Sequence, residues 1–230
     1  MQAYSATNSV RQTVPAVIAL RGATALARPG SPRRLSGMKS ILARGDELFA
    51  EGDDADFFYK VVSGTIRTYK LLNDGRRQID AFHLAGDIFG MEPGAAHRFS
   101  AEAVERCEVI AFRRCRFATL AEDDPALGDQ LMSSMMVNLE RAHDHMLLLG
   151  RKTAQEKIAT FLLDMARRVS TGDSFELPMQ RSDIADHLGL TIETVSRTLT
   201  QLAKEGVIKL ASASRSVVLS DKAALQRLNA

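Results

Sequence analysis

The chain has 230 residues, a formal net charge of +2 at pH 7 and two cysteines. A chain of this length can bury a sizeable core and typically forms two domains, while its near-neutral charge does not by itself indicate a nucleic-acid partner. Two cysteines without paired spacing argue against a disulfide framework and fit a reducing cytoplasm. No apolar run approaches the ~18 residues of a membrane-spanning helix, so we expect a cytoplasmic protein without membrane contact.

Residues 1–35 are predicted to be a flexible N-terminal extension. The segment is rich in Ser, Ala, Arg and Pro, and the first acidic residue of the chain is Asp46. Arg-rich, acid-poor N-termini also occur in organellar transit peptides, an alternative that we consider weaker than a disordered extension. The apolar residues 14–20 could form a short helix, and we assign the extension no function.

Residues 36–123 carry a pattern of short strands separated by glycine-containing turns. Strand-like segments lie at 57–62 and 65–72, and Asn73-Asp74-Gly75 is a typical hairpin turn before a return strand at 76–84. A further turn and strand follow at 85–90, and two more strands at 100–112. Many short strands at even spacing predict a β-roll, a cupin-like jelly roll.

Residues 124–150 predict one long helix with two apolar stripes. The first stripe recurs at heptad-like spacing and consists of Leu131, Met135, Asn138, Ala142, His145 and Leu149. The second stripe lies beside it and consists of Met132, Met136, Leu139 and Met146. Two adjacent stripes suit a helix that packs on its own β-roll and on a partner helix, although one broad buried face in a monomer gives the same pattern. Gly150 is the expected hinge after this helix.

Residues 151–230 predict a small domain with a helical motif at 180–203. An amphipathic helix is expected at 153–169, and two short helices follow with Gly189 in the turn between them. Thr191 is a suitable N-cap for the second short helix. Residues 207–210 and 216–219 predict a hairpin, and 221–228 a helix of unknown role. This is the layout of a winged helix-turn-helix, in which Lys209 and Arg215 lie where a wing can touch phosphate.

The second short helix of this motif has one apolar and one polar face. The apolar face, expected to point inward, consists of Ile192, Val195, Leu199 and Leu202. The polar face consists of Glu193, Thr194, Ser196, Arg197 and Thr200. An ordinary helical hairpin, with Glu193 and Arg197 as a surface pair worth ~0.3–0.5 kcal/mol, is the alternative. We favour DNA binding, because Arg can pair bidentately with guanine and Glu can accept from the amino group of cytosine.

Residues 188–208, LGLTIETVSRTLTQLAKEGVI, resemble the recognition region of the CRP/FNR superfamily of bacterial transcription regulators. The E-x-x-S-R spacing of Glu193, Ser196 and Arg197 is similar to the FNR and FixK branches. The resemblance extends over residues 36–219, where the runs GTIRTY, DGRRQI and AGDIFG resemble the effector domain of the superfamily. It implies an α+β fold with a β-roll effector-type domain at 36–123, a dimerisation helix at 124–150 and a winged helix-turn-helix domain at 151–230.

The resemblance also implies partners and site residues. It implies a homodimer that joins through the first stripe, binds double-stranded DNA with two-fold symmetry and contacts RNA polymerase. The residues expected to read the bases, in a half-site like the family's TTGA core, are Glu193, Ser196, Arg197 and Ile192. The residues expected to touch phosphate are Arg181, Thr191, Thr194 and Lys209. Control of microaerobic respiration or nitrogen fixation follows only by association.

The superfamily uses its β-roll for cyclic nucleotides, iron–sulfur clusters, haem or 2-oxoglutarate, and the residues of this chain argue against the first two. A cyclic-nucleotide site needs a Glu for the ribose and an Arg-Ser pair for the phosphate. Met91 stands at the Glu position with Glu92 one residue later, and His97-Arg98 stands at the Arg-Ser position. A [4Fe–4S] cluster needs four thiolates, and the chain has two cysteines.

Several residues keep other possibilities open. Haem remains an option through the histidines His83, His97, His143 and His145, whereas His187 is expected at the surface. Cys107 is expected to be a buried small apolar residue. Cys115 is flanked by arginines, a cationic setting that would make its thiol reactive, but we favour the interpretation that it has no chemical role.

We therefore predict a homodimeric, FixK-like activator with no cofactor, no metal and no catalytic site. The competing hypotheses are a ligand- or haem-dependent sensor of the same superfamily and an interaction module that does not bind DNA.

Overall fold

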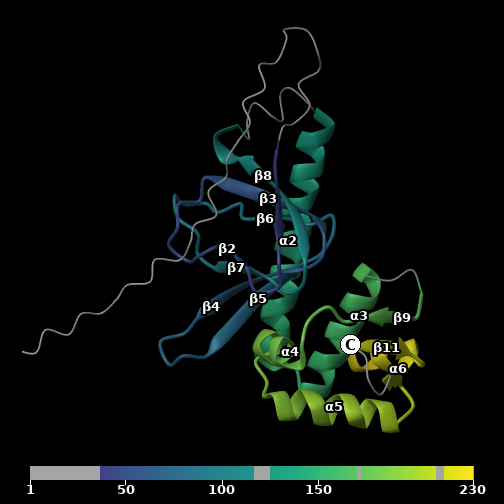
Figure 1. Ribbon diagram of the computed structural model, residues 1–230. Coiled ribbons are helices and arrows are strands. Elements are labelled where there is room, and N and C mark those ends of the chain that lie inside the picture. The colour runs from purple at the N-terminus through teal and green to yellow at the C-terminus, as the bar shows by residue number, and fades with distance from the viewer. Residues whose placement is uncertain (1–36, 117–124, 170–171, 211–214, 230) are drawn as a thin grey trace, which may run out of the picture. The chain divides into compact units, whose positions relative to one another are not determined.

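The computed structural model describes residues 37–116, 125–169, 172–210 and 215–229, which belong to one compact unit (Figure 1). The predicted extension at 1–35, with its candidate helix at 14–20, lies outside the described residues. Within the described part, no helix combines the length and the hydropathy needed to cross a membrane.

Two four-stranded antiparallel sheets build the predicted β-roll. The first has the order β1 (Met38–Leu42), β8 (Cys107–Arg113), β3 (Phe57–Ser63) and β6 (Ile88–Phe89). The second has the order β2 (Glu47–Phe49), β7 (Ser100–Ala103), β4 (Ile66–Leu71) and β5 (Arg77–His83). Alternate side chains of the two sheets form a shared apolar core, as the period of two along a strand requires. This core includes Val61, Ile66 and Val109, each with 0% exposure.

Glycines set the tight turns of the roll. Gly75 takes the left-handed conformation (φ 83°) in the β4–β5 turn that Asn73-Asp74-Gly75 predicted. Gly64 (φ 79°) lies between β3 and β4, and a Cβ there would stand 2.4 Å from the carbonyl oxygen of Arg106. A side chain at Gly64 would therefore force the strands apart.

Helix α2 (Pro125–Arg151) is continuous through Gly150, so the predicted hinge is not at that residue. The break falls at residues 152–153, before α3 (Ala154–Val169). Thr153 N donates to Glu156 Oε2 at 2.6 Å, and Glu156 N donates to Thr153 Oγ1 at 3.4 Å. This reciprocal capping box starts a new helix, which is why the chain breaks there and not at the glycine.

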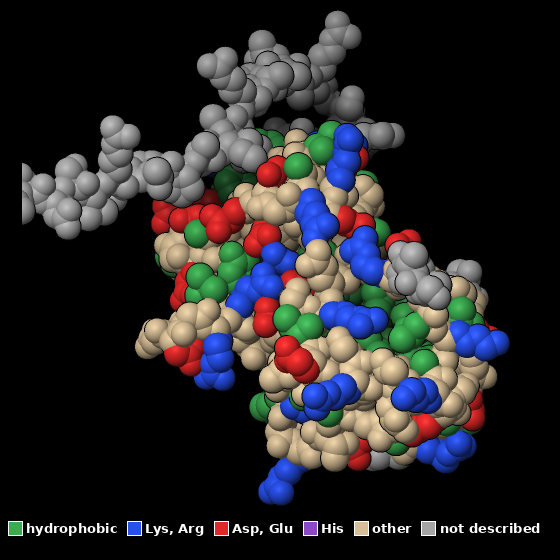
Figure 2. All heavy atoms as spheres, turned by 60° about the horizontal axis from the view of Figure 1, so that its bottom comes forward, with side chains coloured by type: hydrophobic (Ala, Val, Ile, Leu, Met, Phe, Trp, Pro, Cys, Tyr) green, Lys and Arg blue, Asp and Glu red, His purple; other side chains and the backbone are tan. Residues whose placement is uncertain are grey.

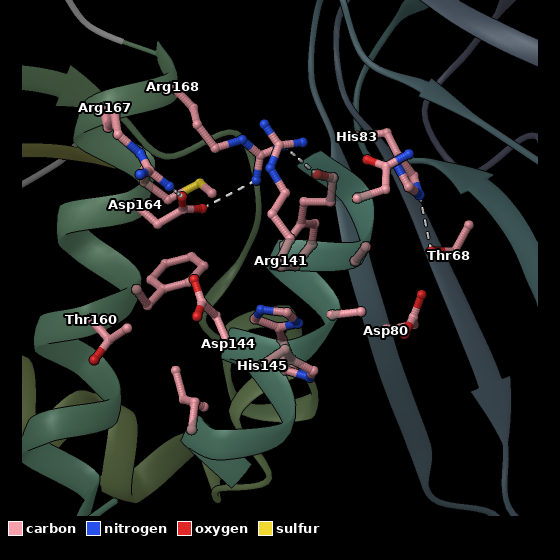
Figure 3. A pocket seen from close by; sticks show the side chains of 18 of the residues that line it. Thr68, Asp80, His83, Arg141, Asp144, His145, Thr160, Asp164, Arg167 and Arg168 are labelled. Atoms are coloured by element: carbon pink, nitrogen blue, oxygen red, sulfur yellow. Dashed lines mark hydrogen bonds and ion pairs between the residues drawn. The ribbon is translucent and has the colours of Figure 1, made fainter. Parts of the chain in front are cut away.

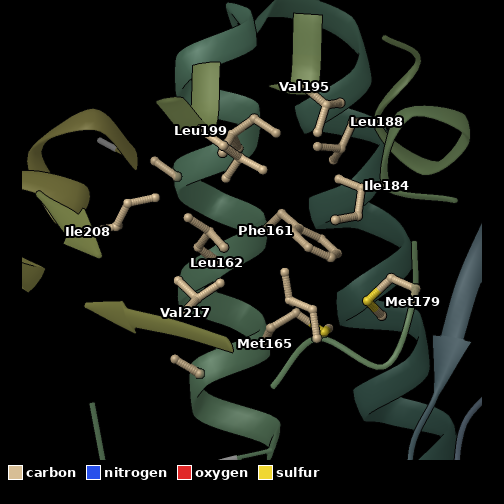
Figure 4. Packing of buried hydrophobic residues seen from close by; sticks show 14 of the residues in the cluster. Phe161, Leu162, Met165, Met179, Ile184, Leu188, Val195, Leu199, Ile208 and Val217 are labelled. Atoms are coloured by element: carbon tan, nitrogen blue, oxygen red, sulfur yellow. The ribbon is translucent and has the colours of Figure 1, made fainter. Parts of the chain in front are cut away.

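The C-terminal domain is a three-helix core with a small sheet. Helices α3, α4 (Arg181–Leu188) and α5 (Ile192–Lys204) pack together, and the sheet has the order β10 (Ile208–Leu210), β11 (Ser216–Leu219) and β9 (Ser174–Glu176). Figure 4 shows Phe161, Leu162 and Met165 of α3 at the centre of this packing, between the side chains of α4, α5 and the sheet. Strand β9 was not predicted, because three residues carry too little alternation to be recognised.

The C-terminal helix α6 (Lys222–Asn229) packs on α3. Its Leu225 is fully buried in the shared core. At its end, the Asn229 side chain accepts from Thr160 Oγ1 at 2.6 Å and from Lys152 Nζ at 2.8 Å. The helix whose role the sequence left open therefore supports the first helix of this domain.

Candidate nucleic-acid interface

Helices α4 and α5 form the predicted helix-turn-helix, and local chemistry sets both of its boundaries. Helix α4 ends at Gly189, which adopts the left-handed conformation (φ 61°, ψ 44°). Helix α5 begins after Thr191, whose hydroxyl accepts from Thr194 N at 3.2 Å, as predicted for an N-cap. The two helices are thus joined by a short turn with fixed geometry.

A narrow apolar stripe anchors α5, and its opposite face is open. Val195, Leu199 and Leu202 are at most 3% exposed and pack against α3 and α4. Ile192, expected on the inward face, is 48% exposed at the first turn. Its position beside the polar side chains fits contact with a thymine methyl group better than core packing.

The predicted base-reading residues lie together on the first two turns of this open face. Glu193 and Arg197 are exposed, and Ser196 is partly exposed. Hydrogen bonds from the Glu193 backbone and Thr191, with the charge of Arg197, lower the pKa of Glu193. The residue is therefore a carboxylate at neutral pH and can accept hydrogen bonds from a base edge.

The predicted phosphate-contacting residues surround this face. Arg181 opens α4 and donates from Nη1 to Ser196 Oγ at 3.3 Å, so it lies beside the base-reading group. The hydroxyls of Thr191 and Thr194 are 3.1 Å apart, and Lys209 on β10 is exposed. Figure 2 turns the lower side of Figure 1 forward and shows Lys and Arg side chains spread across it.

Arg215 is exposed next to the wing, and its contact with phosphate stays a prediction. Its guanidinium donates to the carbonyl oxygen of Pro178, and this contact ties β11 back to the segment before α4. The tip of the wing at 211–214 lies outside the described residues.

The two stripes of α2 have different surroundings. In the first stripe, Leu131 is 1% exposed and packs on Phe58 and Ile88 of its own roll. Asn138 Nδ2 donates to the Ile88 carbonyl at 2.8 Å. Of the remaining members, His145 and Leu149 are partly buried, while Met135 and Ala142 are exposed. Much of the face predicted to meet a partner helix is therefore covered by the chain itself.

The second stripe of α2 is open. Exposed fractions are 56% for Met132, 60% for Met136, 52% for Leu139 and 63% for Met146. These residues follow one another at spacings of four, three and seven, the pattern of a coiled-coil seam.

A cavity of about 890 Å³ lies between the β-roll, α2 and α3 (Figure 3). Its arginines are paired with carboxylates of the chain. Asp87 joins Arg141 at 3.0 Å and Arg168 at 2.7 Å, and Arg168 also contacts Asp164 at 3.2 Å. Burial opposes ionisation of Asp87, but the charge of Arg168 and the bonds from Leu84 and Arg141 outweigh it and lower its pKa.

The residues near this cavity do not fit a cyclic nucleotide held in the family's way. Met91 and Glu92 line the cavity, but Arg98, one residue after the predicted Arg position, is exposed and is not part of the lining. His97 is 3% exposed and stacks on Phe49 with ring centroids 3.6 Å apart. At the position predicted to correspond to the family's Arg, the chain thus has a buried imidazole.

The cysteines do not fit an iron–sulfur cluster, and the candidate haem ligand His83 has other partners within the chain. Cys107 is buried in β8, where burial raises its thiol pKa and its Sγ donates to the Thr65 carbonyl at 3.1 Å. Cys115 is exposed. His83 bonds Thr68 at 3.0 Å and stacks on Phe89, and burial lowers its pKa to about 4. Among the described residues, no group of His, Cys, Asp and Glu side chains is arranged to hold a metal ion.

A β-roll, a long helix and a winged helix-turn-helix with an open polar face on its second helix together define a DNA-binding transcription regulator of the CRP type. Comparisons with known protein families agree. Residues 40–124 match the cyclic nucleotide-binding domain, and residues 156–228 match the Crp-like helix-turn-helix domain.

The chain belongs to the CRP/FNR superfamily, in its FixK-like branch. It is 49% identical to the nitrogen fixation regulation protein FixK of Azorhizobium caulinodans, over 88% of this chain and 84% of that protein. It is 35% identical to the fumarate and nitrate reduction regulatory protein of Escherichia coli, over 83% and 78% of the two chains. The structure of FixK2 from Bradyrhizobium japonicum superposes with a TM-score of 0.79 at 45% identity, covering 85% of this chain and 98% of that one. The predicted family is therefore confirmed.

Proposed function

We propose that the protein is a cytoplasmic homodimer that binds a two-fold symmetric DNA site and activates transcription through contact with RNA polymerase. The observation that carries this proposal is the first two turns of α5, where Glu193 and Arg197 are exposed and Ser196 is partly exposed above a buried apolar stripe. The name of the Azorhizobium relative supports a role in regulating nitrogen fixation. A microaerobic response stays a prediction by association with the family.

Glu193, Ser196, Arg197 and Ile192 are the proposed base contacts. Arg197 donates to guanine, and Glu193 accepts from the cytosine of the same pair. Ser196 contacts the neighbouring base, and Ile192 packs against a thymine methyl group. Their common position on the first two turns of α5 supports this division, because that end of a recognition helix reaches base edges first.

Arg181, Thr191, Thr194 and Lys209 are the proposed phosphate contacts. They lie around the base-reading face and are exposed or partly exposed. The Arg181–Ser196 hydrogen bond supports a link between the two groups, because a phosphate-bound Arg181 would also fix the Ser196 rotamer. These contacts position the protein on DNA without specifying the sequence.

The second stripe of α2 is the proposed dimer interface, in place of the first. An exposed apolar stripe of this size on a monomer marks an interaction surface. The heptad spacing of Met132, Met136, Leu139 and Met146 matches an identical helix related by a two-fold axis.

Cyclic nucleotide and an iron–sulfur cluster are not part of the proposed mechanism. A gel-shift titration of purified protein, with reductant and without added effector, tests the proposal on a palindromic TTGA-type duplex. Tight, specific binding that millimolar cyclic AMP leaves unchanged is expected. Binding that appears only with cyclic AMP would favour a ligand-dependent sensor, and equal binding to a scrambled duplex would remove the sequence-specific function.

A further inference from the structure

A carboxylate at the start of the helix-turn-helix lies between two guanidinium groups of the β-roll. Asp183 Oδ1 accepts from Arg67 Nη1 of β4 at 2.8 Å and from Arg77 Nη2 of β5 at 2.7 Å. The Asp183 side chain is 4% exposed, and those of Arg67 and Arg77 are 13% and 22% exposed. Charges this well shielded from water interact strongly and are costly to leave unpaired.

Each arginine extends the network in its own direction. Arg77 also contacts Asp186, one turn further along α4, through Nε at 2.9 Å and Nη2 at 2.8 Å. Arg67 also contacts Glu102 of β7 at 2.6 Å. We call these five residues, Arg67, Arg77, Glu102, Asp183 and Asp186, the ionic clamp.

The clamp is built into the beginning of α4. The second oxygen of Asp183, Oδ2, accepts from Gln180 N at 3.2 Å and so completes the helix cap. One side chain therefore starts the helix and attaches it to the roll. The two residues after Arg77 contact the other end of α4. Gln78 Nε2 donates to the His187 carbonyl at 3.3 Å, and His187 Nδ1 bonds the Ile79 carbonyl at 3.1 Å. Helix α4 thus packs beside β5 (Figure 1).

The orientation of α5 follows from that of α4. The short turn at Gly189 and the shared core of Ile184, Leu188, Val195 and Leu199 join the two helices rigidly. Whatever fixes α4 against the β-roll therefore fixes the recognition helix against the roll as well.

We propose that the ionic clamp positions the recognition helix of each protomer for simultaneous binding of two half-sites. The inference rests on the proposed dimeric DNA binding. Directional charged contacts fix one orientation, whereas an apolar contact of the same size would tolerate several. The clamp supplies this orientation from within the chain, so that it does not depend on a bound effector.

Binding to paired and single half-sites tests this role. Arg77→Gln removes two carboxylate contacts, and Asp183→Asn removes the charge while keeping an oxygen for the Gln180 cap. Arg76→Gln is the matched control, because Arg76 neighbours Arg77 but pairs with Asp74 in the exposed β4–β5 turn. Urea denaturation and sedimentation of each variant give the folded and dimeric fractions, to which the affinities are normalised.

We expect Arg77→Gln and Asp183→Asn to bind a duplex with one half-site within about twofold of wild type. We expect them to lose at least about tenfold on the palindrome, and to discriminate less against spacers one base pair longer or shorter. Arg76→Gln should behave as wild type in both measurements.

A purely structural role for the clamp would lower both affinities equally and leave the spacer preference unchanged. That result would overturn the positioning role of the clamp and leave the proposed function intact. Wild-type affinities and wild-type spacer preference in both variants would do the same. If the wild type bound the palindrome no more tightly than a single half-site, the proposed function would be wrong, and the positioning role of the clamp would fall with it.

Discussion

The imidazole of His145 on α2 lies parallel to the imidazole of His187 on α4, with ring centroids 4.2 Å apart and ring planes at 12°. His187 also meets the Phe82 ring edge-on, at 5.2 Å between centroids. His187 is therefore partly buried and not the surface residue that was expected, because its ring packs against α2 and the roll. The pair joins the long helix to the first helix of the DNA-binding motif.

This stacked pair predicts a pH dependence of stability. Burial and the nearby His145 lower the pKa of His187 to about 3, and burial and Lys157 lower that of His145. Unfolded histidine titrates near 6.5, so the unfolded state binds protons first as the pH falls. The two histidines therefore leave the free energy of unfolding at its full value above about pH 6.5 and lower it progressively below that pH.

His187→Gln should flatten this dependence. Between pH 7 and pH 5 we expect the variant to lose about 1–2 kcal/mol less unfolding free energy than wild type. Urea denaturation at the two pH values measures the difference. The exposed His143, replaced by Gln, is the control and should keep the wild-type slope. If the unfolding free energies of wild type and His187→Gln changed equally with pH, the two histidines would have to be protonated alike in the folded and unfolded states.

Leu162→Ala should destabilise the C-terminal domain strongly. Leu162 has 0% exposure at the centre of the core in Figure 4, so truncation leaves a cavity between α3, α5 and the sheet. Such a change costs about 2–5 kcal/mol. Leu71→Ala, at a position 61% exposed on β4, should stay within about 0.5 kcal/mol of wild type. Urea denaturation followed by circular dichroism compares the two, and a similar loss in both would contradict the packing described for Leu162.

Met136→Glu should convert dimers to monomers. It places a carboxylate in the middle of the second stripe, where two identical helices would have to bury it twice. Sedimentation equilibrium at micromolar concentration measures the change. Val137→Glu adds the same charge to the next residue, off the stripe, and should remain dimeric. A dimeric Met136→Glu together with a monomeric Val137→Glu would move the interface to another face of α2.

Local signals in the sequence predicted the helix-turn-helix well. The turn glycine Gly189, the cap Thr191 and the stripe of Val195, Leu199 and Leu202 act over a few residues, and each is found as expected. The same holds for the β4–β5 hairpin, whose turn residues fix its geometry.

Contacts between distant residues could not be predicted in this way. Asp183 and Arg67 are 116 positions apart, and nothing in the local pattern of either one indicates the other. The two stripes of α2 were visible, but periodicity alone does not say which one faces the chain itself. That choice depends on where Phe58 and Ile88 of the roll meet Leu131, which is a property of the folded chain.

Base discrimination by Arg197 is the most direct measure of sequence-specific reading by α5. Affinities of wild type and Arg197→Ala are compared on palindromic duplexes with the G·C pair of each half-site intact or replaced. The variant should lose roughly 1–3 kcal/mol per half-site on the intact duplex and much less on the replaced one.

Lys209→Ala is the matched control for this measurement. As a phosphate contact, Lys209 should affect all duplexes alike and reduce the slope of log affinity against log salt by about one unit. If Arg197→Ala instead weakened every duplex equally and left discrimination at the G·C pair intact, the reading of bases by Arg197 would be contradicted.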